Sequence, residues 1–231
     1  MTPIPIVALD VPGQEAALRL VDQLGASCRF YKIGAELFTG AGPAVVGEVR
    51  ARGAEVFLDL KYHDIPNTVA AAVSRAAQLG VRLLTVHASG GPTMLKAAVE
   101  AAGDPTRCAV LAVTLLTSLE SEEVAAVWGR DRSLRIADEV LRLAELAGET
   151  GAAGVVCGGK EAWRVKQRFG SSLSVLIPGI RMAGGPAHDQ ARVSTPADAV
   201  AARADYVVVG RAVTAAEDRR AAMREMLVQL T

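Results

Sequence analysis

The sequence predicts a closed (β/α)8 barrel (TIM barrel) that forms a single domain over residues 1–231. The first observation is that eight short runs of β-branched and other apolar residues alternate with longer Ala- and Leu-rich stretches of helical periodicity. Eight such units in 231 residues give about 29 residues each, close to the ~30 of a βαβ unit. The second observation is that Val11-Pro12-Gly13-Gln14 does not match the Gly-rich fingerprint expected after the first strand of an open doubly wound sheet. Regular alternation therefore favours parallel strands inside a ring of helices.

The elements follow from local composition, taken in chain order. Strands are expected over residues 4–9, 30–33, 56–60, 83–87, 108–116, 154–157, 175–180 and 206–209. Helical periodicity with charged faces is clearest over residues 14–24, 66–79, 134–149 and 216–230. Helix C-caps are expected at four glycines, because a left-handed cap favours this residue: Gly25, Gly53, Gly80 and Gly103.

Composition and charge exclude several classes of protein. A chain with 51% hydrophobic residues is too apolar for disorder, and 25 basic against 25 acidic side chains argue against a broad electrostatic surface for nucleic acid or anionic lipid. Three separated cysteines, Cys28, Cys108 and Cys157, are typical of reduced thiols. No signal-peptide pattern begins the sequence, and no apolar run approaches the ~18 residues of a membrane span. We therefore expect a cytoplasmic protein without nucleic-acid or membrane partners.

Charged side chains stand at the carboxyl ends of the first three expected strands, where barrel enzymes carry their chemistry. Side chains alternate across a strand, so Asp59 and Lys61 are expected on the opposite face from the aliphatic residues between them, inside the barrel mouth. Asp10 and Lys32 have the same expected orientation. Four charges of alternating sign then meet in one confined place, where charges are tolerated only if they are paired or used. The alternative is a structural salt-bridge network that closes the top of the barrel.

Two features indicate a site for a phosphate group. The segment after the seventh strand, residues 179–192, is long and Gly-rich, and the eighth strand leads into Gly210-Arg211. Loops at these two places commonly bind phosphate in barrel enzymes, and Arg211 could add a charge-assisted contact. The alternative is a mobile surface loop with a solvated arginine.

The other motifs in the sequence point less clearly to a function. His63, His87 and His188 have no recognised zinc-site spacing with cysteines or carboxylates, and neither a Walker A motif nor a G-x-S-x-G elbow occurs. His87 is interpreted either as a site residue or as a hydrogen-bonded structural histidine at a strand end. The sequence gives no metal site.

The segment from Phe57 to Thr68, FLDLKYHDIPNT, closely resembles the signature of the orotidine 5′-phosphate decarboxylase family, bacterial type. Its D-x-K-x-x-D core is Asp59, Lys61 and Asp64. The core alone is shared with sugar-phosphate decarboxylases and synthases, whereas the string that ends in Asp-Ile-Pro-Asn-Thr is much more specific. Further segments in family order extend the resemblance over essentially the whole chain: residues 8–10, 32–38, 86–88, 113–118, 178–181, 189–190 and 210–214.

The resemblance implies decarboxylation of orotidine 5′-monophosphate to UMP and CO₂, the last step of de novo UMP synthesis, without a metal or organic cofactor. In that case Lys61 protonates C6 of the pyrimidine, and Asp59 lies beside the substrate carboxylate. The remaining roles carried over from the family are ribose binding by Asp10 and Lys32, a pyrimidine contact by Thr117, and phosphate binding by Arg181, Gln190, Gly210 and Arg211. Asp64 and Thr68 are implied to reach the neighbouring subunit's site, so the enzyme is expected to be a homodimer.

Two departures from the family pattern are visible, and three alternatives stay open. Met182 and Ala183 follow Arg181 where proline is common, and Gly158 follows Cys157 where serine is usual. The first alternative is a Mg²⁺-dependent sugar-phosphate decarboxylase or hexulose-phosphate synthase. The second is a Schiff-base aldolase, which the flanking carboxylates disfavour because they keep the lysine protonated. The third is a nucleotide-binding barrel without catalysis.

Overall fold

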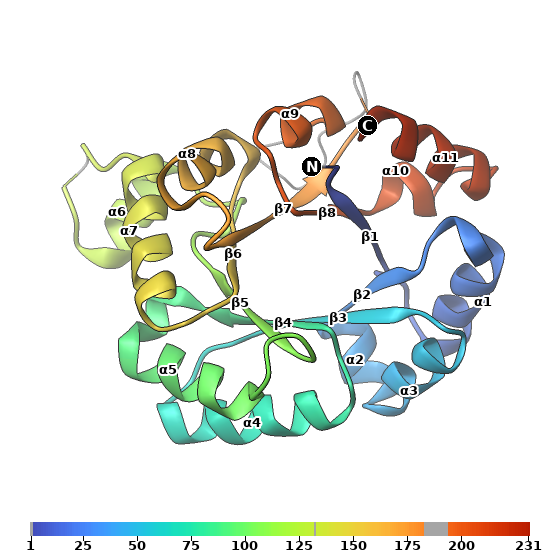
Figure 1. Ribbon diagram of the computed structural model, residues 1–231, viewed down its shortest axis with the longest axis horizontal. Coiled ribbons are helices and arrows are strands. Elements are labelled where there is room, and N and C mark those ends of the chain that lie inside the picture. Colours follow the sequence, from blue (N-terminus) through green and yellow to red (C-terminus); the bar gives the residue numbers. More distant parts are fainter. Residues whose placement is uncertain (1, 132, 183–193) are drawn as a thin grey trace.

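Parallel strands form a closed ring at the centre of the molecule, with helices around it (Figure 1). The structure is a computed structural model that describes residues 2–131, 133–182 and 194–231. Within these residues the ring has eight strands in sequence order, and β1 pairs with β8 to close it. The strands are β1 (Ile4–Ala8), β2 (Phe30–Gly34), β3 (Glu55–Tyr62), β4 (Leu83–His87), β5 (Ala109–Val113), β6 (Gly154–Val156), β7 (Ser174–Ile180) and β8 (Tyr206–Val209). The predicted (β/α)8 barrel is confirmed.

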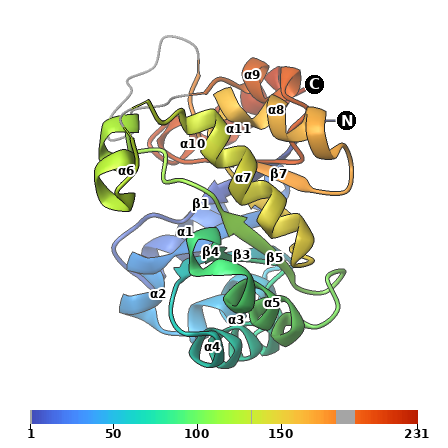
Figure 2. The same cartoon turned by 90° about the vertical axis from the view of Figure 1, so that its left-hand side faces the viewer.

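The helices lie between successive strands and cover the outside of the ring, as Figure 2 shows from the side. They are α1 (Gln14–Leu24), α2 (Ala35–Ala41), α3 (Ala44–Ala51), α4 (Pro66–Gln78), α5 (Gly91–Ala102), α6 (Ser121–Trp128), α7 (Ile136–Glu149), α8 (Gly159–Phe169), α9 (Pro196–Ala201), α10 (Arg211–Thr214) and α11 (Arg219–Gln229), with short 3-10 turns at Gly25–Ser27 and Ala88–Gly90. The two ends of the chain lie near each other in both views, because β1 and the last helices meet where the ring closes.

Alternation along the strands separates two apolar layers. Phe57, for example, packs inside the ring, whereas its neighbours Val56 and Leu58 pack between the ring and the helices. The same alternation turns Lys32 toward the mouth and Ile33 toward the helices. Burial of the aliphatic face against the helices fixes the register of each strand, since a slip of one residue would exchange the two faces.

The predicted helix boundaries are correct to within a few residues. The four glycines predicted as helix caps all have positive φ, between 52° and 75°. The stretch predicted from residue 216 begins as α11 only at Arg219, because the side chain of Asp218 accepts a hydrogen bond from Ala221 N–H and so caps the helix there. The stretch predicted from residue 134 begins at Ile136, since Arg135 is still extended.

The fifth strand is shorter than predicted. Residues 108–116 were expected to be extended, but β5 ends at Val113. Its neighbour β6 has three residues, so the ladder runs out, and both Thr114 N–H and its hydroxyl bond the same carbonyl, Val156 O. Leu115 and Leu116 follow the strand and line a cavity.

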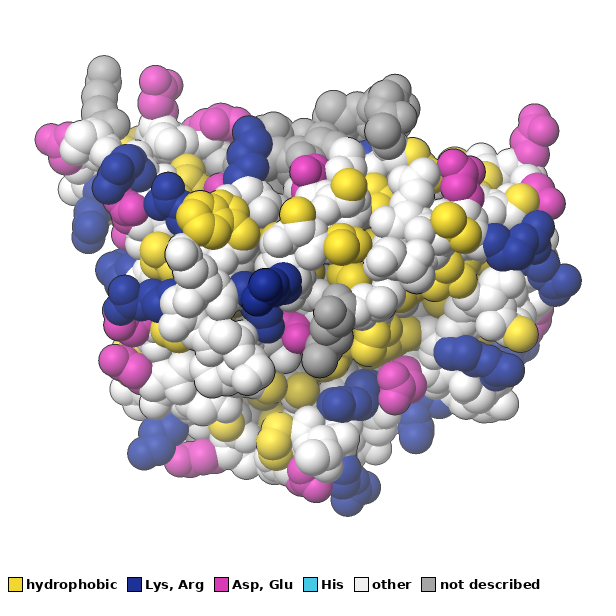
Figure 3. Space-filling view, turned by 45° about the horizontal axis from the view of Figure 1, so that its top comes forward, with side chains coloured by type: hydrophobic (Ala, Val, Ile, Leu, Met, Phe, Trp, Pro, Cys, Tyr) yellow, Lys and Arg dark blue, Asp and Glu magenta, His cyan; other side chains and the backbone are white. Residues whose placement is uncertain are grey.

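The surface matches the balanced charge of the sequence. On the face seen in Figure 3, basic and acidic side chains are interspersed. No helix of the described residues is long and apolar enough to cross a membrane.

Candidate active site

A cavity of about 550 Å³ opens at the carboxyl ends of the strands. The structure brings together there most of the side chains that the sequence singled out: Asp10, Lys32, Asp59, Lys61, Thr117, Arg181, Gly210 and Arg211. They come from segments that are far apart in the chain, and the closed ring of strands is what makes them converge. Thr117 follows β5 in a turn and does not end a strand as expected.

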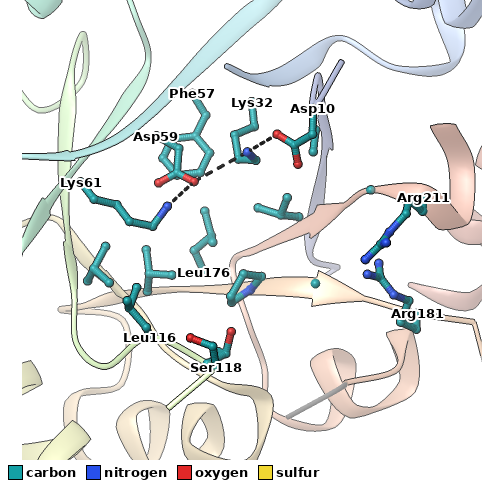
Figure 4. Close-up of a pocket in the computed structure, with 18 of the residues that line it drawn as sticks. Asp10, Lys32, Phe57, Asp59, Lys61, Leu116, Ser118, Leu176, Arg181 and Arg211 are labelled. Atoms are coloured by element: carbon teal, nitrogen blue, oxygen red, sulfur yellow. Dashed lines mark hydrogen bonds and ion pairs between the residues drawn. The ribbon is translucent and has the colours of Figure 1, made fainter. Parts of the chain in front are cut away.

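Four charged groups form one continuous array along one side of the cavity (Figure 4). Lys32 Nζ lies 2.8 Å from Asp10 Oδ1 and 3.8 Å from Asp59 Oδ2, and Lys61 Nζ lies 2.8 Å from the same Asp59 oxygen. The side chains of Lys32 and Asp59 are only 11% and 13% exposed. Charges this deeply buried require close partners, and the alternating signs supply them.

The carboxyl end of β3 departs from regular strand geometry where it carries Lys61. Leu58 pairs with Leu84 and Tyr62 with Val86, so four steps on β3 face two steps on β4. Lys61 has a φ of 50°, in the left-handed region that residues with a Cβ rarely adopt. This bulge delivers Lys61 to the cavity with its ammonium group on Asp59.

Gly34 provides the space for the pair formed by Lys32 and Asp10. A Cβ at this position would lie 3.0 Å from Lys32 Nζ and 3.3 Å from Asp10 Oδ1. The backbone there has φ −92°, so the requirement is for room and not for glycine's conformational freedom.

Two arginines lie away from the charge array, at another end of the cavity (Figure 4). Arg181 is buried just after β7, and a Cβ added to Gly210 would lie 3.9 Å from its Nη1. Arg211, next in the chain, begins α10 and lines the same cavity. Two guanidinium groups at one end give a site suited to a doubly charged anion such as a phosphate.

Some predicted residues lie elsewhere. Asp64 and Thr68 are exposed and do not line this cavity, and the Asp64 side chain accepts a hydrogen bond from Ile65 N–H. Gln190 lies outside the described residues. His87 is half-buried outside the cavity with its ring centre 5.4 Å from that of His63, and burial, together with the charges of His63 and Lys61, lowers its pKa.

Sequence reasoning missed the apolar part of the lining. Phe57, Val113, Leu115, Val156 and Leu176 also line the cavity. Their apolar character looks the same in the sequence as that of any core residue, so the sequence alone does not single them out. Ser118 and Pro178 also line the cavity and carried no signal beyond their positions beside Thr117 and the Gly-rich segment.

The fold and the site define a (β/α)8-barrel enzyme, and comparison with known proteins gives its family. The model of the orotidine 5′-phosphate decarboxylase / HUMPS family matches residues 3–226. Among curated proteins, the orotidine 5′-phosphate decarboxylase of Halorhodospira halophila is 49% identical over 229 residues, which cover 97% of this chain and 94% of that protein. The protein of the same name from Nitrosococcus oceani is 46% identical over 228 residues, 98% of this chain and 97% of that protein.

A solved structure agrees with these relatives. The crystal structure of orotidine 5′-phosphate decarboxylase from Lactobacillus acidophilus superposes with a TM-score of 0.86 at 35% identity and covers 100% of both chains. The chain therefore belongs to the orotidine 5′-phosphate decarboxylase / HUMPS family, and it is an enzyme of the carboxy-lyase type.

Proposed function

We propose that the chain decarboxylates orotidine 5′-monophosphate to UMP and CO₂ in pyrimidine biosynthesis. The observation that carries the proposal is the alternating array of Asp10, Lys32, Asp59 and Lys61 in a cavity that also holds two arginines. Relatives that bear the decarboxylase name at 44–49% identity support this substrate over the sugar phosphates of the wider family.

The proposed step is cleavage of the bond between C6 of the pyrimidine and the carboxylate carbon. CO₂ leaves, and the bonding electron pair remains on C6, where the ring cannot easily delocalise it. The Lys61 ammonium group stabilises this developing negative charge and then transfers a proton to C6, and solvent afterwards reprotonates the amine. A preorganised cation in a partly buried site is an effective catalyst of this kind, because it is already oriented before charge develops.

Asp59 has two effects on this step. Its carboxylate accepts a hydrogen bond from the Lys61 ammonium group at 2.8 Å and so aims it. It would also repel the substrate carboxylate, by about 4 kcal/mol at a separation of ~4 Å and an effective dielectric constant of ~20, before the two lysines offset it. The first effect is the one that we assign to Asp59.

Binding of the rest of the nucleotide is proposed as follows. Asp10 and Lys32 hold the ribose, and Thr117 contacts the pyrimidine. Arg181, Gly210 and Arg211 bind the phosphate, together with Gln190. The position of the two arginines away from the charge array supports this division, because the phosphate and C6 lie at opposite ends of the substrate.

We further propose that the enzyme is a homodimer in which Asp64 and Thr68 of each copy complete the cavity of the other. Both residues are exposed near the mouth of their own barrel, and Ile65 between them is 67% exposed. The exposed Ile65 side chain supplies apolar area that a contact with a second copy would bury. The proposal also includes a cytoplasmic location, which the three buried and widely separated cysteines support, and no metal or organic cofactor.

Ultraviolet absorbance of orotidine 5′-monophosphate, followed with purified protein in EDTA, tests the proposal. We expect loss of the substrate band with the wild type and a fall in rate of at least about a thousandfold for Lys61→Ala. Lys96→Ala is the matched control, since this lysine lies on α5 outside the cavity, is 71% exposed and has its Nζ 4.0 Å from Glu100 Oε1. It should leave the rate unchanged.

Three outcomes would contradict the proposal in different ways. No loss of the band with the wild type would reject the substrate, and sugar phosphates with Mg²⁺ would be assayed next. A rate that EDTA abolishes would reject metal-free chemistry. A fully active Lys61→Ala variant would reject the proton donor while leaving the reaction intact.

A further inference from the structure

A buried hydroxyl lies between the aspartate and the lysine at the centre of the charge array. Thr85, in β4, is 0% exposed and does not line the cavity. Its Oγ1 donates to Asp59 Oδ1 at 2.9 Å and accepts from the backbone N–H of Lys61 at 2.9 Å. An ionised carboxylate only accepts and a backbone amide only donates, so both directions follow from the geometry.

The hydroxyl supports the backbone where β3 bulges. Between the pairs Leu58–Leu84 and Tyr62–Val86 the regular ladder is interrupted, and Thr85 is the β4 residue opposite this interruption. The Lys61 N–H bonds the Thr85 side chain there, at the residue that adopts a φ of 50°. A buried amide without this partner would favour another backbone conformation, because buried N–H groups are almost always hydrogen-bonded.

The same hydroxyl fixes the rotation of the Asp59 carboxylate. With Oδ1 held by Thr85, Oδ2 is the oxygen that faces Lys61 at 2.8 Å and Lys32 at 3.8 Å. A carboxylate rotates easily about its terminal bond, so without the hydroxyl neither the position of Oδ2 nor the aim of the Lys61 ammonium group is determined by Asp59 alone. One hydroxyl therefore holds both the backbone of Lys61 and the group that aims its side chain.

We propose that Thr85 is a positioning residue for the decarboxylation, acting through Asp59 and Lys61 without touching the substrate. The inference rests on the proposed function, in which Lys61 is the proton donor. Because the hydroxyl acts on Asp59 and on the backbone of Lys61, the groups assigned to the chemical step, substrate affinity should depend on it far less than turnover does.

The test compares Thr85→Val, Thr85→Ser and Thr114→Val by steady-state kinetics with orotidine 5′-monophosphate. Valine keeps the shape of threonine and a strong strand preference but removes the hydroxyl, whereas serine keeps the hydroxyl and removes the methyl group. Thr114 is the matched control: it is 2% exposed just after β5, and its hydroxyl bonds Val156 O instead of the charge array. Thr85→Ala replaces the valine variant if that variant fails to fold.

We expect kcat to fall about tenfold or more in Thr85→Val, as for a hydrogen bond to a charged group, with KM within about twofold of the wild type. Thr85→Ser should recover most of kcat, and Thr114→Val should keep it. The proposal is overturned if Thr85→Val keeps its kcat, if Thr85→Ser is as slow as Thr85→Val, or if Thr114→Val loses as much.

Crystal structures of the valine and serine variants give a readout that does not depend on turnover. The valine variant should lose the left-handed φ at Lys61 or the contact of Oδ2 with the Lys61 ammonium group, and the serine variant should retain both. An unchanged site in the Thr85→Val structure would overturn the inference, whether or not the wild type decarboxylates orotidine 5′-monophosphate. Inactivity of the wild type on this substrate would by itself reject only the proposed function.

Discussion

Replacing Gly34 with alanine perturbs the charge array without removing any charge. The added Cβ would lie 3.0 Å from Lys32 Nζ and 3.3 Å from Asp10 Oδ1, both shorter than an ordinary contact. Lys32 Nζ is the end of a flexible side chain, so we expect the ammonium group to move away from the added Cβ while the backbone stays in place. With φ −92°, the backbone at Gly34 is already one that alanine adopts readily.

The size of the effect follows from the ion pair. Relief of the contact requires a retreat of about 0.5 Å, since non-bonded atoms prefer a separation of ~3.5 Å or more. At an effective dielectric constant of ~20, lengthening the Lys32–Asp10 pair from 2.8 Å by this amount weakens it by about 0.9 kcal/mol. The Asp10 side chain is 61% exposed, so solvent screening reduces this further. We expect KM for orotidine 5′-monophosphate to rise about two- to fourfold, because this pair is proposed to hold the ribose.

Steady-state kinetics and thermal unfolding of Gly34→Ala and Gly13→Ala measure this prediction. Gly13 is the matched control, because it is also the N-cap of a helix, α1, and a Cβ there meets nothing within 4 Å. Both variants should lose the same small amount of helix-capping stability, but only Gly34→Ala should change KM. An unchanged KM for Gly34→Ala, or an equal rise for Gly13→Ala, would refute the steric argument.

Two further predictions concern stability. Burial and the charges of His63 and Lys61 lower the pKa of His87 below its ordinary value of 6.5, so the folded state binds fewer protons there than the unfolded state. His87 therefore lowers the free energy of unfolding of the wild type as the pH falls below 6.5. Between pH 7.5 and pH 5.5, urea unfolding should show a smaller decrease in this free energy for His87→Gln than for the wild type, and an equal decrease would contradict the prediction. Gly154→Ala places a Cβ 2.5 Å from the carbonyl oxygen of Ser174, between β6 and β7. We expect it to lower the melting temperature by roughly 4–8 °C, the effect of about 2 kcal/mol of overpacking, and an unchanged value in calorimetry would argue against so tight a strand contact.

Much of the barrel and of the charge array follows from the sequence because both depend on periodicities that are local. The alternation of apolar and charged residues around Asp59 predicts which face of β3 turns into the mouth, and the structure has Asp59 and Lys61 there. The reasoning works because a strand has only two faces and one of them must pack against helices.

The part that could not be predicted depends on pairing between strands. Regular alternation predicts that Lys61 faces the mouth, but it does not reveal the bulge that interrupts β3 or the left-handed backbone through which Lys61 reaches the cavity. Thr85 appears in the sequence as one polar residue in an apolar strand, and its partners lie 24 and 26 positions away. The prediction for β5 was too long for the same reason. The strand ends because its partner β6 is short, and the composition of residues 114–116 does not show this.

Apolar side chains line the cavity beside the charges, which explains why the charges of the array pair with one another. The segments that end β1, β2 and β3 supply Asp10, Lys32, Asp59 and Lys61, whereas β5, β6 and β7 contribute apolar side chains from Val113, Val156 and Leu176. An apolar wall offers little screening, so the Lys32 ammonium group, whose side chain is 11% exposed, depends on the nearby carboxylates of Asp10 and Asp59. The same wall strengthens every interaction of the array with a bound anion. The positions of the four charges therefore matter more here than at a solvated surface. Two residues without charge help to fix these positions: Gly34 leaves room for Lys32 and Asp10, and the Thr85 hydroxyl forms two hydrogen bonds, to Asp59 and to the Lys61 backbone.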